Sequence, residues 1–143
     1  MPANFHPLFV HFPIALLLSS VALSWVAHFW PGKDLNQAAW YTLLLGLTGA
    51  ALTLITGFLD AQRVPLNSPA ISTLNIHRAL GISTFVIFGA LAIWSWRSKG
   101  AIGGRSRTLY TVLQVVGVAL IATVGFLGGE LVYTFGLGVA TMP

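Results

Sequence analysis

The sequence predicts an all-α protein, an antiparallel bundle of four transmembrane helices in a single domain over residues 1–143. Hydrophobic residues make up 56% of the chain and charged residues only 7%, with a mean hydropathy of +0.83. These values lie far from those of soluble domains. Four stretches without charged residues are each close to the roughly 20 residues that a helix needs to cross about 30 Å of hydrocarbon. The charge-free stretches are 7–30, 38–59, 79–96 and 108–129, and the spans predicted around them cover about 7–30, 38–60, 73–97 and 107–129.

The first span is expected to stay in the mature protein. No Lys or Arg precedes it and no A-x-A-like site follows it, so it lacks the marks of a signal peptide. Pro13 cannot donate a hydrogen bond to the carbonyl of Phe9 and should disturb the helix around His11.

The other three spans carry small or polar residues at helical spacing. The second has Gly46, Gly49, Ala50, Thr53, Thr56, Gly57 and Asp60; the third has His77, Gly81, Thr84 and Phe88; the fourth has Gln114, Gly117, Ile121, Gly125 and Gly128. Residues three or four apart share a helix face. We expect these faces to point inward, where small residues permit close packing or leave room for a bound group.

A weak internal sequence similarity indicates two similar helical hairpins. Thr56–Asp60 and Val124–Gly128 share Gly-Phe-Leu, and the separation between these segments is nearly the same as that between His11 and His77. Chance explains so short an identity equally well. If the repeat is real, His11 and His77 are symmetry mates about an axis along the membrane normal.

Basic residues predict the orientation, because Lys and Arg in short loops stay in the cytoplasm. The first and third connections hold Lys33, Arg97, Lys99, Arg105 and Arg107, whereas the opposite ends hold only Arg63 and Arg78. We therefore expect an integral protein of the bacterial inner membrane with both termini in the periplasm. The net charge of +4 fits topology and contact with the lipid bilayer, and no motif for nucleic-acid binding is present.

Residues that carry chemistry should meet at one end of this bundle, because antiparallel spans alternate in direction. They are His6, His11, Asp60, Arg63, His77, Arg78 and Glu130. The chain has no cysteine, which excludes disulfides, thiolate metal sites, iron–sulfur clusters and covalently attached haem.

The preferred hypothesis is a small b-type cytochrome that holds one haem b between His11 and His77. Adjacent helices pack about 8–10 Å apart, so the diagonal first and third spans lie roughly 12–14 Å apart, a gap that suits two imidazoles and a macrocycle. Arg63 and Arg78 would pair with the propionates, and Asp60 and Glu130 would orient the imidazoles. The residues that leave room for the macrocycle would be Gly57, Gly81 and Gly125. Electron transfer would involve quinol or a periplasmic redox partner.

Two alternatives remain open. A non-haem transition metal would use imidazole and carboxylate ligands, drawn from His6, His11, His77, Asp60 and Glu130. In the other, the protein is a structural subunit of a larger membrane complex. Common catalytic motifs are absent, so the sequence leaves open whether the protein is an enzyme.

The two ends of the chain carry the motifs of a family resemblance. The segment 4–16, Asn-Phe-His-Pro-Leu-Phe-Val-His-Phe-Pro-Ile-Ala-Leu, and the segment 128–139, Gly-Gly-Glu-Leu-Val-Tyr-Thr-Phe-Gly-Leu-Gly-Val, resemble those of a bacterial membrane family labelled domain of unknown function 2231. The resemblance covers essentially the whole chain and implies a four-helix membrane protein. Occasional fusion of the family to Rieske-type domains implies a link to redox work but assigns no reaction. Phe135 stands where the family often has histidine, so a site that needs this imidazole is in doubt here.

Overall fold

The structure is all-helical, as the sequence predicts. The computed structural model describes residues 6–30, 34–99 and 102–138, and none of these residues forms a strand. The helices are α1 (His6–Phe9), α2 (His11–Phe29), α3 (Leu35–Ala61), α4 (Ile71–Arg97) and α5 (Gly104–Tyr133). The last four are long and apolar enough to cross a membrane, which confirms the predicted four-helix transmembrane architecture.

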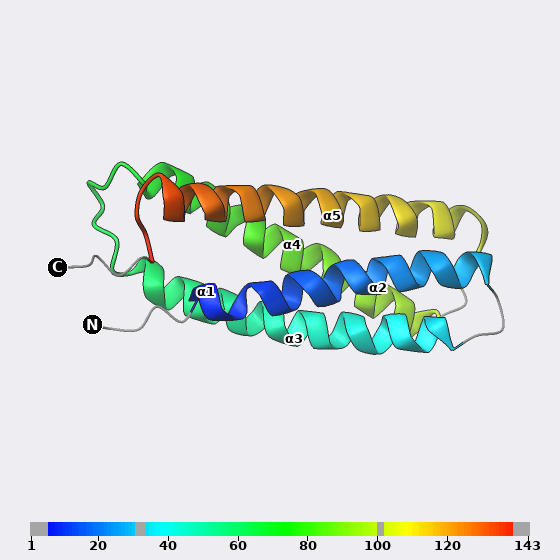
Figure 1. Cartoon of the computed structure of the whole chain (residues 1–143). Coiled ribbons are helices and arrows are strands. Elements are labelled where there is room, and N and C mark those ends of the chain that lie inside the picture. The colour runs from blue at the N-terminus through cyan, green and yellow to red at the C-terminus, as the bar shows by residue number, and fades with distance from the viewer. Residues whose placement is uncertain (1–5, 31–33, 100–101, 139–143) are drawn as a thin grey trace.

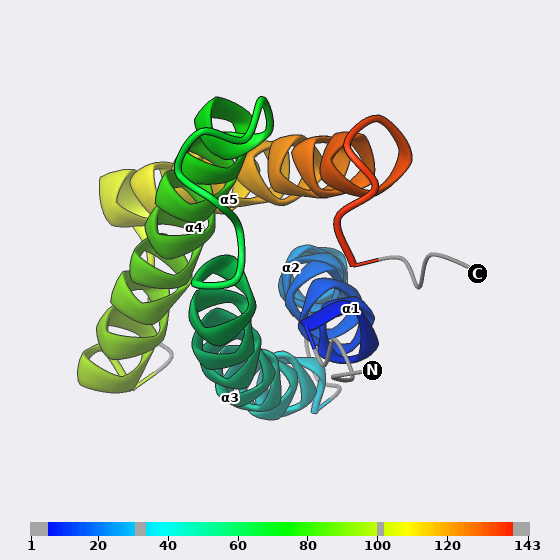
Figure 2. The same cartoon turned by 90° about the vertical axis from the view of Figure 1, so that its left-hand side faces the viewer.

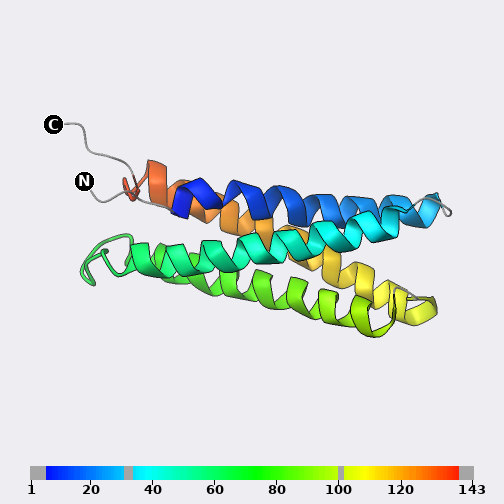
Figure 3. The ribbon, with the colours of Figure 1, turned by 90° about the horizontal axis from the view of Figure 1, so that it is seen from below.

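The four long helices α2 to α5 are antiparallel, each running opposite to the one before it in the chain (Figure 1). Helices α2 and α3 pack as one hairpin and α4 and α5 as a second, and the hairpins meet mainly where α3 contacts α4. Helix α2 has much less contact with α5, and Figures 2 and 3 show these helices from the end and from below. We call the end that holds His6 and His77 the histidine end, and the end that holds Arg97 and Arg107 the basic end.

The first span is interrupted at Val10, which separates the single turn of α1 from α2. Two backbone hydrogen bonds around the interruption are long, at 3.3 Å from Val10 to His6 and 3.5 Å from Ile14 to Val10. Pro13 supplies the physical reason, since it has no N–H to donate in this turn. The disturbance expected around His11 is present.

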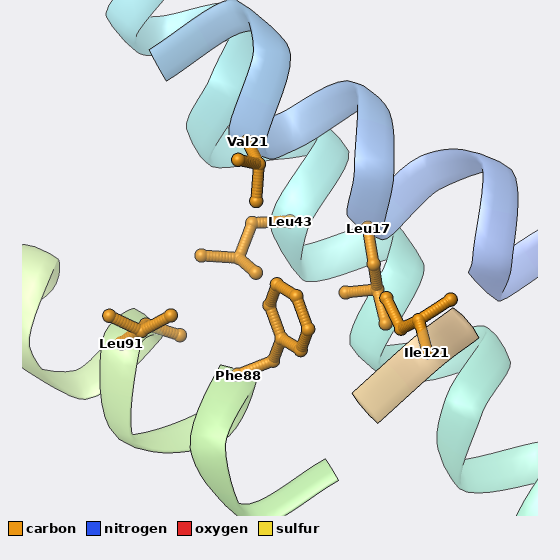
Figure 4. Close-up of a cluster of buried hydrophobic side chains, with 7 residues drawn as sticks. Leu17, Val21, Leu43, Phe88, Leu91 and Ile121 are labelled. Carbon is orange, nitrogen blue, oxygen red and sulfur yellow. The ribbon is translucent and has the colours of Figure 1, made fainter. Parts of the chain in front are cut away.

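The core at mid-bundle is a cluster of large buried hydrophobic side chains (Figure 4), two of which fit against glycine. Phe88 is fully buried, and a methyl group on Gly117 would lie 2.8 Å from its ring. Leu17 lies against Gly46 in the same way, with 2.8 Å to its Cδ2 atom. The inward-facing glycine rows predicted for α3 and α5 are therefore used at these positions for close helix packing.

The outer surface of the bundle is apolar. Only 17% to 28% of the residues in the most hydrophobic window of each long helix are buried inside the protein. Large side chains such as Ile55, Val86 and Phe126 are more than half exposed. In water such a surface would drive association, whereas hydrocarbon solvates it, so the molecule is suited to a bilayer. Lys33, which contributes to the predicted orientation, lies outside the described residues.

Candidate functional site

Two histidines meet at the histidine end. The ring of His6, at the start of α1, and the ring of His77, in the second turn of α4, have centroids 6.1 Å apart and planes inclined at 84°. His77 is the seventh residue of α4, which places it about 9 Å along the helix at about 1.5 Å per residue. The pair therefore lies inside the bundle end rather than on its outer rim.

Each imidazole is held by a backbone carbonyl of its own hairpin. His6 Nδ1 lies 2.9 Å from the carbonyl oxygen of Thr53 on α3, and His77 Nδ1 lies 3.1 Å from that of Val124 on α5. A carbonyl oxygen only accepts hydrogen bonds, so Nδ1 is the donor in both rings. In the neutral imidazole this fixes the tautomer and leaves the Nε2 lone pair free for another partner.

Glycine provides the space that each ring occupies. A methyl group on Gly57 would lie 2.9 Å from His6 Nδ1, and one on Gly128 would lie 3.3 Å from His77 Cε1. Gly57 and Gly128 each follow the accepting carbonyl by one helical turn. Each ring is thus fixed by one hydrogen bond and one close backbone surface on the same helix.

The two hairpins repeat these contacts in a constant register. The corresponding residues, whose separation along the chain is the same in every pair, are His6 and His77, Leu17 and Phe88, Gly46 and Gly117, Thr53 and Val124, and Gly57 and Gly128. The geometry supports the expected pair of similar hairpins but changes its register. His6 takes the place that the sequence analysis gave to His11.

His11 does not join His77 in the structure. It is exposed on the outside of α2. Residues five apart point about 140° away from one another on a helix, so an inward-facing His6 leaves His11 facing outward. The remaining histidine, His28, lies at the basic end, where it lines a cavity.

Asp60 acts on the backbone of His6 rather than on its ring. Its Oδ2 accepts a hydrogen bond from the His6 N–H at 3.2 Å, while Oδ1 pairs with Arg63 at 3.1 Å. One carboxylate oxygen thus ties the turn of α1 to the end of α3, and the other pairs with a cation at that same end. The orienting role expected for this residue falls to the Thr53 carbonyl instead.

The other predicted site residues lie around the pair without joining it. The guanidinium of Arg78 stacks on the Phe58 ring, 4.6 Å from its centroid, and Glu130 is half-buried near the end of α5. A methyl group on Gly81 would lie 3.8 Å from Leu54. The inward position predicted for Gly125 is wrong, because this residue is exposed and a methyl group on it would meet nothing within 4 Å. Gly57 is the predicted glycine that faces a histidine.

No group of three or more His, Asp or Glu side chains suited to a metal ion forms within residues 6–30, 34–99 and 102–138. Of the five ligands in the non-haem hypothesis, His6 and His77 are the two whose rings lie together. One polar group nearby lacks a partner: the Thr53 hydroxyl is buried without a hydrogen bond. A buried hydroxyl without a partner is costly, so it marks a place where a small polar ligand or water would be stabilised.

Phe135 closes the same end with apolar contacts. It packs on a buried cluster of Ala70, Leu74 and Leu131, together with Val64 and Leu137. Leu74 lies one turn before His77 on α4, so position 135 belongs to the neighbourhood of the histidine pair. The Phe135 ring contributes apolar packing at this position, whereas a histidine would contribute a possible metal ligand.

From the sequence, His6 and His77 were expected at the same end and among the ligands of the non-haem alternative, but His11 was preferred as the partner of His77. The spacing held a usable signal, because His6 precedes Gly57 by as many residues as His77 precedes Gly128. A search for histidine and glycine at equal separation in the two halves would have found it. The carbonyl acceptors carry no signal, because every residue has one.

The comparisons with known proteins agree with the architecture. Residues 2–141 match the family described as "Predicted membrane protein (DUF2231)". No curated protein and no solved structure shows a significant match. With nearly the full length matched and four helices able to span a bilayer, the chain belongs to the DUF2231 family of integral membrane proteins.

Proposed function

We propose that the protein is a membrane metal-binding protein that holds one non-haem transition-metal ion between Nε2 of His6 and Nε2 of His77. The observation that carries the proposal is that both imidazoles donate Nδ1–H to a backbone carbonyl. A metal-ligating histidine is typically oriented in this way by its second nitrogen. Imidazole ligands suit zinc, copper and iron.

The separation of the rings supports a shared metal. A metal–nitrogen bond of about 2.0–2.1 Å, with about 1.1 Å from nitrogen to ring centre, puts the centroids of two opposed ligands roughly 6.3 Å apart. The centroids of His6 and His77 are 6.1 Å apart. A tetrahedral angle would bring them to about 5 Å by the same bond lengths, so the spacing favours a wide angle between the two bonds.

The surroundings leave further coordination positions to water. Asp60 is engaged with Arg63 and the His6 backbone, and the chain has no thiolate ligand. The Thr53 hydroxyl, buried without a partner, is suited to hydrogen-bond a metal-bound water. A site with few protein ligands and open positions is typical of metals that exchange ligands or react rather than only stabilise a fold.

Metal retention tests the proposal. The purified protein is loaded separately with zinc, copper and iron, passed through a desalting column and analysed for bound metal. We expect about one ion per chain for one of the metals, and loss of most of it in His6→Ala and in His77→Ala. His11→Ala is the matched control, because His11 lies on the same span but is exposed. Equal retention by wild type and the His6→Ala/His77→Ala double variant would overturn the proposal.

A haem held by the same imidazoles is the second candidate, favoured by the ring spacing, which also fits axial ligands on opposite faces of a porphyrin. In this form the protein would transfer electrons to or from quinol or another redox partner. The imidazoles occupy the space beside Gly57 and Gly128, so these glycines leave no room for a macrocycle. For this reason we place the metal ion first. A visible spectrum with a Soret band that His6→Ala abolishes and His11→Ala preserves would reverse that order.

A further inference from the structure

A cavity lies at the basic end, away from the pair formed by His6 and His77. Its volume is about 960 Å³, and residues of all four long helices line it. Ligand pockets commonly span roughly 300–1,000 Å³, so this cavity is large enough for a molecule with a headgroup and part of a hydrocarbon chain. It lies where α2 has little contact with α5.

A buried amide in the wall offers hydrogen-bond donors. Gln114 is 4% exposed, and its Oε1 accepts a hydrogen bond from Trp25 Nε1 at 2.8 Å. The indole N–H only donates, so the amide is fixed with its NH₂ group on the other side. Among the described residues no acceptor pairs with that group, and Gln114 lines the cavity. A ligand oxygen such as a carbonyl would complete it.

The rim of the cavity is cationic. Arg97, Lys99 and Arg107 line it, and no Asp or Glu does. Arg107 is half-buried and donates from Nη1 to the carbonyl of Ile102 at 3.3 Å. Its remaining donors pair with no carboxylate among the described residues. The ion pair found among them joins Arg63 to Asp60 at the histidine end. A negatively charged group is the partner that this rim lacks.

The floor of the cavity is apolar and reaches the core. Val21, Leu43, Phe88 and Leu91 line it and belong to the buried cluster of the bundle. From rim to floor the lining changes from guanidinium and ammonium groups, through the Gln114 amide, to hydrocarbon. An anionic headgroup, an ester carbonyl and an acyl chain follow in the same order in an anionic phospholipid.

We propose that the basic-end cavity binds one anionic phospholipid. Its phosphate pairs with Arg107, Arg97 and Lys99, its ester carbonyl accepts from the Gln114 amide, and an acyl chain lies on the apolar floor. A zwitterionic lipid fits less well, because no carboxylate lines the cavity to pair with its ammonium group. A quinone would leave the cationic rim without a partner.

Native mass spectrometry of the detergent-purified protein tests this proposal. The protein is delipidated and mixed with equal amounts of phosphatidylglycerol, phosphatidylcholine, oleate or ubiquinone. We expect one phosphatidylglycerol per chain to be retained in preference to phosphatidylcholine. Equal retention of the two phospholipids would overturn the proposal, as would retention of oleate or ubiquinone without phosphatidylglycerol.

Two neighbouring arginines provide a matched pair of variants. Arg107 lines the cavity and Arg105 does not, yet Arg107→Gln and Arg105→Gln change the net charge equally. A basic residue near an anionic lipid surface contributes about 1 kcal/mol, or roughly fivefold in affinity. We expect at least this loss in Arg107→Gln and little change in Arg105→Gln. An equal loss in both would indicate general surface attraction and overturn the site.

Gln114→Leu keeps the charge and approximate volume while removing the amide donors, so it tests the cavity if Arg107→Gln fails to fold. Leucine already stands at the corresponding position of the first hairpin, Leu43. We expect a weaker retention of phosphatidylglycerol with an unchanged circular dichroism spectrum. Unchanged retention in a folded Gln114→Leu would remove the amide from the proposed site and overturn the assignment of the carbonyl contact.

Discussion

The two hairpins place different side chains on the same backbone plan. Both set a large residue against a mid-helix glycine, and both bind a histidine ring to a carbonyl and a second glycine. They differ in the residues around these contacts: Thr53 and Asp60 in the first hairpin stand where the second has Val124 and Leu131. The first hairpin thus supplies polar groups at the histidine end, while the second supplies Gln114 at the basic end. A shared backbone arrangement can carry a different chemistry at each end of the molecule.

Removal of the core ring should produce the largest effect. Phe88 is fully buried, so Phe88→Ala leaves a cavity and is expected to lower the free energy of unfolding by about 3–5 kcal/mol. Denaturant titration in detergent micelles measures the change. Val86→Ala is the control, because Val86 is exposed on the same helix and should cost far less. Equal losses would mean that the hairpins are not held together by this ring.

The mid-helix glycines sharpen the comparison between hairpins. Gly117→Ala places a methyl group 2.8 Å from the rigid, buried Phe88 ring, and Gly46→Ala places one 2.8 Å from the end of the Leu17 side chain. Overpacking typically costs about 1–3 kcal/mol, and a leucine methyl moves aside more readily than a phenyl ring. We expect Gly117→Ala to destabilise more than Gly46→Ala in the same titration.

Gly125→Ala provides the control for helix propensity in these glycine variants. Nothing lies within 4 Å of the added methyl group, so the higher helix propensity of alanine should dominate and stabilise by up to about 1 kcal/mol. A destabilised Gly125→Ala would contradict the outward placement of this glycine.

Alanine at the glycine next to each histidine ring should lower metal retention by a different amount in the two hairpins. Gly57→Ala brings a methyl group to 2.9 Å from His6 Nδ1, whereas Gly128→Ala leaves 3.3 Å to His77 Cε1. We expect Gly57→Ala to displace its imidazole more and to lower metal retention more. Elemental analysis of the loaded variants decides the order, and the reverse order would contradict the ring positions.

Thr53→Val makes the two hairpins alike and should have the smallest effect on stability. It removes a buried hydroxyl without a hydrogen-bond partner. The free energy of unfolding in the absence of metal should therefore stay the same or rise by up to about 1 kcal/mol. If the hydroxyl serves a metal-bound water, the same variant should retain less metal. A stability loss above about 1 kcal/mol in the metal-free protein would mean that the hydroxyl already has a partner.

Much of the architecture could be predicted from the sequence because it depends on composition and spacing. Hydropathy predicted four membrane helices. The helical period predicted that Gly46, Gly49 and Gly117 face inward, which they do, whereas the same prediction for Gly125 is wrong because that residue is exposed. Pro13 predicted a disturbance near His11. These are local properties, so one chain segment suffices to infer them.

The candidate site was less accessible to prediction, because it depends on the relative rotation of helices. Alternating direction predicted which residues share an end, but His6 and His11 compete for the inward position and only packing decides between them. Nothing in the residue pattern indicated that Asp60 would bind the backbone of His6. The carbonyls of Thr53 and Val124 depend on main-chain positions that no residue type indicates.

Main-chain anchoring has a consequence for how this site can vary. The groups that orient the two imidazoles are present whatever residue occupies positions 53 and 124, so substitution there removes neither acceptor. A change of side chain at either position should therefore leave the orientation of the imidazoles unchanged as long as the helices keep their shape, even where Thr53→Val weakens metal retention. Saturation mutagenesis read out by ring orientation should find few constraints at positions 53 and 124 and strong ones at Gly57 and Gly128, where a side chain would meet the rings.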